Sequence, residues 1–593
     1  MVQVKSCLTS SVLEKCGFCS QEVSKFIQSE SEEKSSSSLV SLFEHINASG
    51  VPNFQGCRIR VNKEFNMPLW RSKLKDYEDR VVCEFLEYGF PLDFDRKRKC
   101  FDTRKNHKGA REYPKFVEKY LKKECDEVRI AGPFNDNPLS VPLVVSPMNT
   151  VPKANSLDER RLIVDLSWPI GAAVNEGISK DFYLGEVIDL HYASVEQVCR
   201  MVMETGAGSF IYKRDLRHAY RQFPVDPRDY RYLGYCWDDN LFFDTVLAMG
   251  QRNAAMACSR VTKAIMFMHC AAGYRGTSYL DDLIGVSPEN TSTEAYENLG
   301  HLLNELGLRE NIPKACPPSA VQIVLGIEIN TIKGTMSVPK GRMGEILGLL
   351  DKWTNKVRSD KVDLQSLIGK LQFVSKCVRQ SRIFLNRMLT TLRSMKRDLT
   401  IKLTDSFMKD VKWWSLFMQD FNGVSYFPSL VWSEPDIAFS TDSCLSGCGG
   451  FCNKEYFHAS YPQEILDQDL PIHALEMLAV LIAVRFWGRY CVAGKIQIFC
   501  DNEPVVRVIN SSKTRDDFMA TCLRELWLEV SKFRFELRAV HLPGVDDRVA
   551  DWLSRWDLSP EYSQSFLRFI GDEVDTYSNL DVTSEYFQFS GEL

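Results

Sequence analysis

The pattern of apolar and polar residues divides the chain into regions of different secondary structure. Short apolar runs that suit strands alternate with helical patterns across residues 141–332, and this alternation returns across residues 436–556. Between these regions, residues 340–420 show almost only helical periodicity. Residues 28–38 are Ser, Glu and Lys with almost nothing apolar, which is typical of a disordered linker. The pattern predicts an α+β protein of several domains.

Length and composition agree with this division. The chain has 593 residues, and a single hydrophobic core stops growing at roughly 250–300 residues, so we expect three or more modules. Hydrophobic residues make up 44% of the sequence and charged residues 25%, which are ordinary globular values. No apolar run approaches the roughly 20 residues needed to cross a bilayer, and we see no secretory signal. We therefore expect an intracellular protein, cytoplasmic or nuclear, without a membrane partner.

The cysteine pattern favours reduced thiols. The 19 Cys are odd in number and lie within apolar runs, which does not suit a disulfide framework. Cys16 and Cys19 form a CxxC pair, but no second Cys or His pair follows at metal-ligand spacing. We therefore expect no zinc site at this pair.

Positive charge is concentrated in two segments, although the net charge is −5. Residues 96–123 and 340–412 are rich in Lys and Arg, while acidic residues after Arg568 mask them in the total. Such basic segments suit contacts with a nucleic-acid backbone. Taken alone, each segment is more simply explained as a solvated helix face.

Three carboxylates form the first candidate metal site. Residues 209–216 suit a buried strand that ends near Asp215, and Asp281 with Asp282 lies between two apolar flanks, at the tip of an expected hairpin. Two adjacent carboxylates repel each other unless a cation is present. Together with Asp215 they can bind two Mg²⁺ ions roughly 4 Å apart, one activating a 3′-hydroxyl and one stabilising pyrophosphate. An Asp pair in a turn is, by itself, more often only a turn.

Four more acids lie on four separate predicted elements. They are Asp442, Glu476, Asp501 and Asp551. Residues 437–451 suit two strands joined through a glycine-rich turn, with the first acid at the centre of the first strand. Residues 472–487 suit an amphipathic helix with the second acid beside its buried stripe. The third acid ends an alternating strand and the fourth lies on a helix at 548–555. The four can converge on one metal pair, although each alone is more simply a surface charge or a helix cap.

The surroundings of the first site resemble reverse transcriptases. Residues 212–225 (YKRDLRHAYRQFPV) resemble their first palm motif, and residues 279–282 (YLDD) resemble their aromatic-x-Asp-Asp signature. Upstream, VPK at 151–153 and RRLIVDLS at 160–167 are similar to the fingers motifs that hold the nucleotide triphosphate. Three further segments match in the same order: residues 247–255 (LAMGQRNAA), 299–314 and 324–329. The resemblance covers about 190 residues.

This resemblance implies roles for individual residues. It assigns Asp215, Asp281 and Asp282 to the metal ions. The residues it assigns to the nucleotide and its product are Lys153 and Arg161 for the triphosphate, Tyr220 for exclusion of a ribose 2′-hydroxyl, Gly250 for the surface beneath the nucleotide, and Lys314 for protonation of pyrophosphate. A plain core aromatic is the alternative for Tyr220, and a surface lysine is the alternative for Lys314.

The second site resembles a ribonuclease H domain over roughly 120 residues. The match ends in residues 541–555 (HLPGVDDRVADWLSR). It implies two-metal hydrolysis of the RNA strand of an RNA–DNA hybrid, with the four acids as ligands and water as nucleophile. His541 matches a loop His that assists product departure, and a structural His is the alternative.

Together the two resemblances imply a right-hand polymerase of fingers, palm and thumb, followed by a ribonuclease H-like α/β domain. The expected segments are 1–60 (low-complexity or disordered), 61–135 (basic N-terminal extension), 136–335 (fingers and palm), 336–430 (helical thumb and connection), 431–557 (ribonuclease H domain) and 558–593 (acidic tail).

The resemblance also implies cofactors and partners. The cofactor is Mg²⁺, with Mn²⁺ as an alternative, and the partners are an RNA template, a DNA primer, the RNA–DNA hybrid and dNTPs. LIGKLQFV at 367–374 and CDN at 500–502 most resemble DIRS-type retrotransposons, whose relatives pair with a tyrosine recombinase. We find no protease, integrase or recombinase signature, so integration would need a separate protein. A pararetroviral polymerase is one alternative, and a nucleic-acid-binding protein that keeps the fold without turnover is another. The presence of all seven carboxylates argues against the second.

Overall fold

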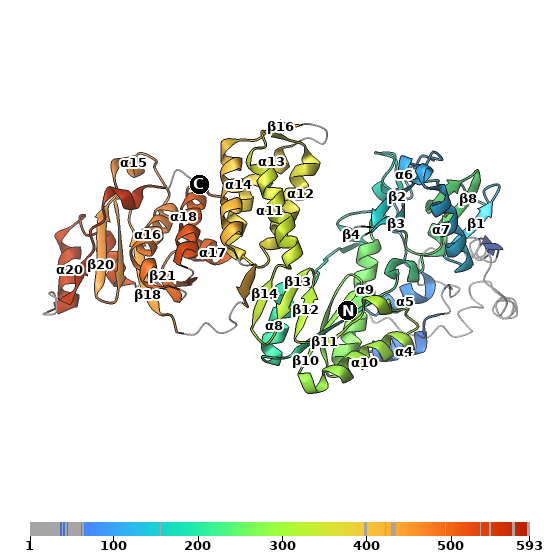
Figure 1. Ribbon diagram of the computed structural model, residues 1–593, viewed down its shortest axis with the longest axis horizontal. Helices are drawn as coiled ribbons and strands as arrows, with labels where there is room; N and C mark the ends of the chain where they lie inside the picture. The colour runs from blue at the N-terminus through green and yellow to red at the C-terminus, as the bar shows by residue number, and fades with distance from the viewer. Residues whose placement is uncertain are drawn as a thin grey trace. The chain divides into compact units, whose positions relative to one another are not determined.

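The protein is described from a computed structural model. The residues that the structure describes are 36–37, 40–41, 44, 61, 64–153, 156–395, 400–421, 423–427, 434–492, 494–533, 535–544, 547–571 and 576–589. The CxxC pair and nearly all of the expected linker lie outside these residues. The chain divides into two compact units, Met1–Gln322 and Ile323–Leu593, and both mix helices with strands (Figure 1). No described helix is both long and apolar enough to cross a membrane.

The first unit contains an antiparallel sheet of four strands in the order β11-β6-β10-β9. The strands are β6 (Phe210–Asp215), β9 (Arg275–Tyr279), β10 (Asp282–Ser287) and β11 (Cys316–Ser319). β9 and β10 form a hairpin, and β6 pairs with β10 along its whole length. This confirms the predicted buried strand and the predicted hairpin.

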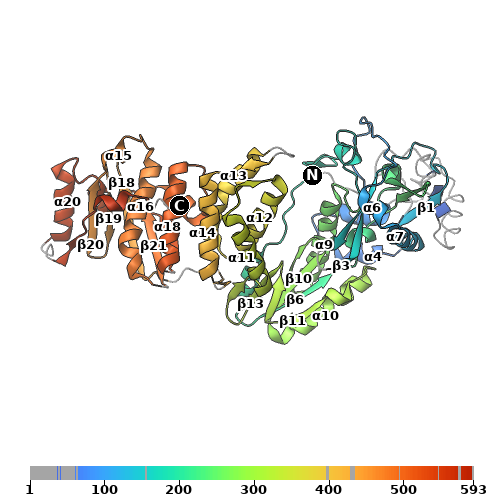
Figure 2. The ribbon, with the colours of Figure 1, turned by 45° about the horizontal axis from the view of Figure 1, so that its top comes forward.

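Helices α8 (Val195–Thr205), α9 (Ala254–Ala271) and α10 (Glu289–Glu305) pack against this sheet (Figure 2). Two glycines permit the close approach of neighbouring side chains. A Cβ at Gly276 would lie 2.1 Å from the terminal methyl carbon of Met266, and one at Gly285 would lie 2.1 Å from the ring of Tyr212. The Tyr212 hydroxyl oxygen lies 2.8 Å from Nε2 of His269 on α9, so the helix and the sheet are joined by a buried polar contact.

Two smaller β-structures and four short helices complete most of the first unit. They are the sheet of β1 (Ile130–Phe134), β7 (Gly234–Trp237) and β8 (Asn240–Asp244), the hairpin of β2 (Met148–Lys153) and β3 (Ser156–Val164), and the helices α4 (Met67–Lys73), α5 (Val81–Tyr88), α6 (Lys108–Glu112) and α7 (Pro114–Asp126). Buried Arg221 joins two of these elements, because its guanidinium lies 2.8 Å from Glu124 on α7 and 2.7 Å from Asp244 on β8. Each of these three buried charges therefore has an opposite charge beside it.

The second unit begins with the strands β13 (Ile327–Asn330) and β14 (Thr335–Ser337), which are followed by a mainly helical segment, as predicted for residues 340–420. Its helices are α11 (Lys340–Thr354), α12 (Lys361–Val374), α13 (Asn386–Ser394) and α14 (Asp405–Asp420). Asp410 on α14 is only 1% exposed and lies 3.1 Å from a guanidinium nitrogen of Arg387 on α13. It also lies 3.7 Å from a guanidinium nitrogen of Arg524, which belongs to α18 (Asp517–Phe533) in the following domain.

A six-stranded mixed sheet forms the core of the domain that follows in the second unit, in the order β22-β21-β18-β19-β20-β23. The strands are β18 (Ile437–Ser443), β19 (Gly447–Cys452), β20 (Glu455–Ser460), β21 (Lys495–Cys500), β22 (Glu536–His541) and β23 (Ser578–Asn579). The helices are α16 (Ile472–Trp487), α17 (Glu503–Ser511), α18, α19 (Arg548–Ser554) and α20 (Pro560–Ile570). Because β23 pairs with β20 and α20 packs on α19, part of the segment expected to be an acidic tail is folded onto this sheet.

Three local predictions for this domain are wrong. Asp442 is the penultimate residue of β18 instead of its centre, and the turn after β18 contains no glycine, because the glycines lie within β19. There they admit α19: a Cβ at Gly449 would lie 2.4 Å from the Cβ of Leu553. The helix α16 is buried on nearly all sides instead of being amphipathic, since the sheet packs on one side of it and α18 packs against it as well.

Replacing Gly449 with Ala should destabilise the second unit by about 1–3 kcal/mol, because the added methyl overlaps the backbone of α19 as well as Leu553. Urea unfolding followed by circular dichroism would measure the change. Gly369→Ala is the matched control, since a Cβ there meets nothing within 4 Å and the residue lies inside α12. This control should be neutral or stabilising by about 0.5–1 kcal/mol. Equal stability of the two variants would contradict the close packing of β19 against α19.

Candidate catalytic sites

The first acid cluster is assembled by strand pairing. Asp215, the last residue of β6, stands directly opposite Asp282, the first residue of β10. Asp281 occupies the hairpin tip after Leu280, whose φ of 52° turns the chain. The carbonyl oxygen of Asp281 accepts a hydrogen bond from the N–H of Leu216 at 3.2 Å, which ties the tip to the end of β6. The three carboxylates predicted to share a metal site therefore lie together.

Asp215 is held by two residues that follow the sheet. Its side chain is 4% exposed, and its two oxygens accept hydrogen bonds from Asn311 Nδ2 at 2.9 Å and from Lys314 Nζ at 3.1 Å. The backbone N–H of Asn311 also donates to the carbonyl of Asp215 at 2.8 Å. The sequence did not single out Asn311 as a site residue, although the segment that carries it matched a palm motif. Lys314 pairs with Asp215 while its own side chain is 62% exposed, so its proposed role at pyrophosphate stays a prediction and a surface lysine stays the alternative.

The electrostatics of this cluster suit a cation. Burial raises the pKa values of Asp281 and Asp282, and the charge of Asp215 raises both further. Lys314 opposes this shift at both positions, and Arg161 opposes it at Asp281. Carboxylate oxygens that gather at low exposure are the ligand set that Mg²⁺ and Mn²⁺ prefer. The residues present therefore fit a divalent-metal site.

Two neighbouring arginines on β3 have different surroundings. Arg160 bonds the hydroxyl and carbonyl of Thr150 and stacks 3.6 Å from the ring centre of Tyr113, so it is occupied in supporting the hairpin. Arg161 is exposed and acts electrostatically on Asp281. The expected contact of Arg161 with the triphosphate stays a prediction. Lys153 ends β2, but its side chain lies outside the described part of the structure.

Tyr220 and Gly250 lie close to neighbours that constrain them. Tyr220 belongs to a short 3-10 helix and is half-buried; burial, with Cys258 and Asp281 nearby, raises the pKa of its hydroxyl. Gly250 has a φ of 111°, and a Cβ there would lie 2.7 Å from the carbonyl oxygen of Val164 on β3. The carbonyl of Gly250 also accepts a hydrogen bond from Asn175 at 2.8 Å. A side chain at position 250 would therefore be strained.

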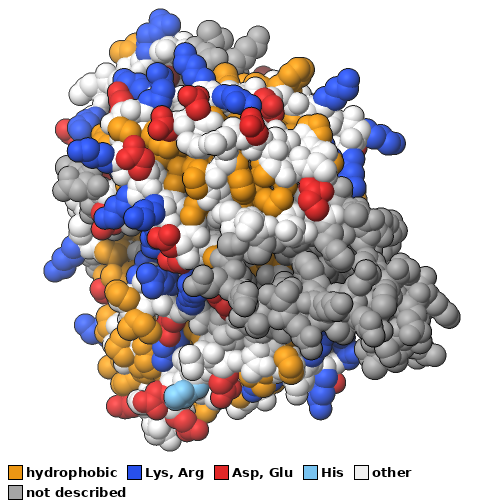
Figure 3. Space-filling model, turned by 90° about the vertical axis from the view of Figure 1, so that its right-hand side faces the viewer, with side chains coloured by type: hydrophobic (Ala, Val, Ile, Leu, Met, Phe, Trp, Pro, Cys, Tyr) orange, Lys and Arg blue, Asp and Glu red, His pale blue; other side chains and the backbone are white. Residues whose placement is uncertain are grey.

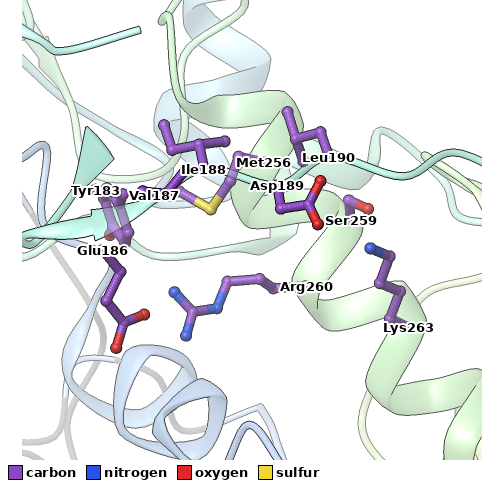
Figure 4. Close-up of a pocket in the computed structure, with 10 residues that line it drawn as sticks. All are labelled: Tyr183, Glu186, Val187, Ile188, Asp189, Leu190, Met256, Ser259, Arg260 and Lys263. Atoms are coloured by element: carbon purple, nitrogen blue, oxygen red, sulfur yellow. The ribbon is translucent and has the colours of Figure 1, made fainter. Parts of the chain in front are cut away.

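A separate cavity of about 180 Å³ lies beside α9 and contains none of the predicted site residues (Figure 4). Its lining residues are Tyr183, Glu186, Val187, Ile188, Asp189, Leu190, Met256, Ser259, Arg260 and Lys263. The guanidinium of Arg260 is already held by both carboxylate oxygens of Asp79 at 2.7 Å. We therefore assign no chemistry to this cavity.

Basic side chains on the described surface are mixed with acidic ones. Figure 3 shows one face of the molecule, on which Lys and Arg lie interspersed with Asp and Glu. The helix α7, within the basic segment 96–123, exposes Lys115, Lys119 and Lys122 and buries Glu124. The exposed ammonium groups suit phosphate contacts, which stay a prediction for both basic segments.

The second acid cluster joins four elements of the mixed sheet. Asp442 comes from β18, Glu476 from α16, Asp501 from the residue after β21, and Asp551 from α19. Asp442 is 5% exposed and accepts a hydrogen bond from the Ser554 hydroxyl at 2.5 Å. Glu476 is 2% exposed and accepts from the N–H of Ser443 at 3.3 Å, while Arg555 pairs with Asp551.

Mutual repulsion and burial act together on these acids. Burial, together with the charges of Asp501 and Asp551, raises the pKa of Asp442 to about 6, against the opposing effect of the hydrogen bond from Ser554. Burial raises the pKa of Glu476 to about 10, with Asp442 and Asp501 as the next causes. Asp442, Glu476 and Asp501 thus act on one another electrostatically, and Asp551 acts on Asp442, as expected of acids that lie near one another.

The sequence missed a fifth acid, Asp547, at the start of α19. It is 4% exposed, and burial followed by the charges of Asp442, Asp501 and Asp551 raises its pKa to about 7. Its Oδ2 has no hydrogen-bond partner in the described part of the chain. The available signal was the Asp-Asp doublet before the helix, which reads as an ordinary N-terminal cap.

The ring nitrogen Nε2 of His541 lies 3.0 Å from the carbonyl oxygen of Asp501, so His541 also borders this cluster.

Comparisons with known proteins show a distant likeness among solved structures. A scan against protein-family models found no match, and a search of curated proteins found no similar sequence. The chain is similar to the foamy viral protease-reverse transcriptase dRH in complex with double-stranded DNA, at 12% identity and a TM-score of 0.44 over 75% of this chain and 71% of that one. It is also similar to the foamy viral protease-reverse transcriptase with double-stranded DNA (12%, TM-score 0.42, 81% and 94% covered) and with an RNA/DNA hybrid (11%, TM-score 0.36, 86% and 85% covered).

The buried acid Glu476 should make the metal-free protein less stable as pH rises. A carboxyl whose folded pKa lies above its unfolded value stabilises the fold while protonated, and this contribution is lost as pH rises toward the folded pKa. With EDTA present, the urea midpoint of the second unit should therefore fall from about pH 5 to about pH 8. The urea midpoint of Glu476→Gln should fall less steeply. The reason is that the rise in the pKa of Glu476, from its usual 4.5 to about 10, covers the whole of this pH window. Parallel pH profiles for the two proteins would contradict the acid cluster.

Proposed function

We propose that this protein is an RNA-directed DNA polymerase with ribonuclease H activity. The pairing of Asp215 with Asp282, which brings Asp281 to the same strand ends, carries the proposal for the first site. Three carboxylates at such an edge fit a two-metal nucleotidyl transfer. Mg²⁺ would supply activation of a primer 3′-hydroxyl and stabilisation of the leaving pyrophosphate when bound.

The protein's own groups would position the nucleotide around these acids. The exposed guanidinium of Arg161 would hold the triphosphate, together with Lys153. The ring of Tyr220, half-buried near Asp281, would leave no room for a ribose 2′-hydroxyl. Lys314, which pairs with Asp215, would lie where it can give a proton to pyrophosphate. Gly250 would let template and nucleotide approach the backbone closely.

The second site supports hydrolysis of the RNA strand of a hybrid. Asp442, Glu476, Asp501 and Asp551 would hold the metal pair, and water would attack the phosphodiester. His541, beside the Asp501 carbonyl, would assist departure of the cleaved end. The two sites share no carboxylate, so the two activities should be separable by mutation.

The biological setting is part of the proposal. The sequence motifs favour a DIRS-type retroelement enzyme acting inside the cell on an RNA template, a DNA primer and dNTPs, with a separate recombinase for integration. A pararetroviral polymerase would carry out the same chemistry. Primer extension on an RNA template with Mg²⁺, scored for DNA product and for loss of the RNA strand, tests the proposed activities directly.

Exchanging Asp281 and Asp282 for Asn should abolish DNA synthesis and spare hybrid cleavage. Removing both charges leaves too few ligands for the metal pair, so synthesis should fall at least about a hundredfold. Asp501→Asn is the reciprocal control and should extend a primer while leaving the RNA strand intact. A folded Asp281→Asn, Asp282→Asn protein that loses both activities equally would contradict two independent sites.

Tyr220→Ala should admit ribonucleotides by removing the clash with the 2′-hydroxyl. The ratio of kcat/KM for a dNTP to that for the matching rNTP should fall at least about tenfold. Tyr220→Phe, which keeps the ring, should retain the wild-type ratio. An unchanged ratio in the alanine variant would place the discrimination elsewhere.

A further inference from the structure

One group of side chains in the second unit combines two acids with a thiol. The carboxylates of Glu476 and Asp501 and the Sγ of Cys500 all lie within 4.8 Å of one another. Cys500 is the last residue of β21 and is fully buried, and Asp501 follows it directly. The β21 strand therefore delivers a sulfur and an oxygen to the same place as Glu476 on α16.

The thiol of Cys500 is buried, but it contacts polar atoms of this group. Its Sγ accepts a hydrogen bond from the N–H of Asn502 at 3.4 Å and lies 4.0 Å from Oε2 of Glu476. A thiol is a poor ligand for Mg²⁺, which prefers oxygen. Sulfur combined with carboxylate oxygens suits Zn²⁺ or Cd²⁺ instead.

A second, independent feature points to a cation here. Asp547 is 4% exposed, and its Oδ2 has no hydrogen-bond partner among the described residues. Its charge interacts with those of Glu476, Cys500 and Asp501, although Asp547 lies outside the group whose donor atoms are all within 4.8 Å of one another. A buried carboxylate oxygen without a partner is costly unless a cation or a proton compensates it.

We propose that Glu476, Cys500 and Asp501 form a binding site for a thiophilic divalent cation such as Zn²⁺, with the nearby charge of Asp547 favouring the bound cation. Three protein donors and one water molecule would complete the tetrahedral coordination that zinc adopts in proteins. Binding releases the thiol proton of Cys500, as it does at other thiolate sites. Because Glu476 and Asp501 also belong to the proposed Mg²⁺ ligand set, a bound thiophilic ion would exclude Mg²⁺ and stop hybrid cleavage. That consequence rests on the proposed function, whereas the binding itself does not.

Titration of the full chain with Cd²⁺ tests the binding. The wild type should show a thiolate-to-cadmium absorption band, and Cys500→Ser should lose the part of this band that one bound Cd²⁺ contributes. The affinity of the protein for this one Cd²⁺ should fall at least about tenfold, since even the loss of an outer-shell partner costs about 10–100-fold. Cys522→Ser is the matched control, because Cys522 is equally buried on α18. Asp547→Asn should weaken binding of the same Cd²⁺ without removing the band, which gives a second test if Cys500→Ser folds poorly. Equal binding by the wild type, Cys500→Ser and Asp547→Asn would overturn the site.

Cleavage of an RNA–DNA hybrid tests the consequence. Each protein's rate with Mg²⁺ and added Zn²⁺ is divided by its own rate with Mg²⁺ alone. Zn²⁺ should inhibit the wild type and Cys522→Ser at least about tenfold more strongly than Cys500→Ser. Equal inhibition of all three would overturn the proposed exclusion of Mg²⁺ by an ion bound at Cys500. Absence of cleavage by the wild type with Mg²⁺ alone would instead refute the ribonuclease H assignment, and the Cd²⁺ titration would still decide the binding site.

Discussion

Repulsion between buried carboxylates is the constraint on which both sites depend. Two like charges 4 Å apart near a protein surface repel by about 4 kcal/mol, which is a large part of the roughly 5–15 kcal/mol that stabilises a folded domain. The backbone hydrogen bonds of β6 with β10, and of β18 with its neighbours, must hold the acids in place against this repulsion. Asp215, Asp282, Asp442 and Asp501 stand at or beside strand ends, where the ladder fixes the backbone. Glu476 and Asp551 are instead held by the helices α16 and α19.

Helper residues reduce the repulsion to different degrees in the two clusters. Asn311 and Lys314 donate to Asp215, so the first cluster has a cation of its own beside the acids. In the second cluster Arg555 pairs with Asp551, whereas the more deeply buried Glu476 accepts from the N–H of Ser443 and, at 4.0 Å, from the thiol of Cys500. The pKa of Glu476 is accordingly raised the most among the acids of the second cluster. A bound cation therefore has more to compensate in the second cluster than in the first.

The sequence predicted the elements better than their surroundings. The strand ending at Asp215 and the hairpin around Asp281 were correct, because alternation and turn position are local signals. The glycines of β19 were assigned to a turn, since nothing in their sequence shows that α19 packs across them. The helix α16 was expected to be amphipathic, although its residues are almost all apolar and the sheet and α18 both cover it. Asp547 was missed for a related reason: Asp442 and Asp501, whose charges act on it, lie more than forty positions away in the sequence.

The ion network at Asp410 has a consequence for how the second unit unfolds. Asp410 is almost wholly buried, and its two arginines come from α13 in the helical segment and from α18 in the mixed-sheet domain. Melting of either segment alone would leave a buried charge without one of its counterions, which costs more free energy than exposing an apolar contact of similar size. The helical segment and the mixed sheet should therefore melt as one cooperative unit, although their sequences look like two separate domains.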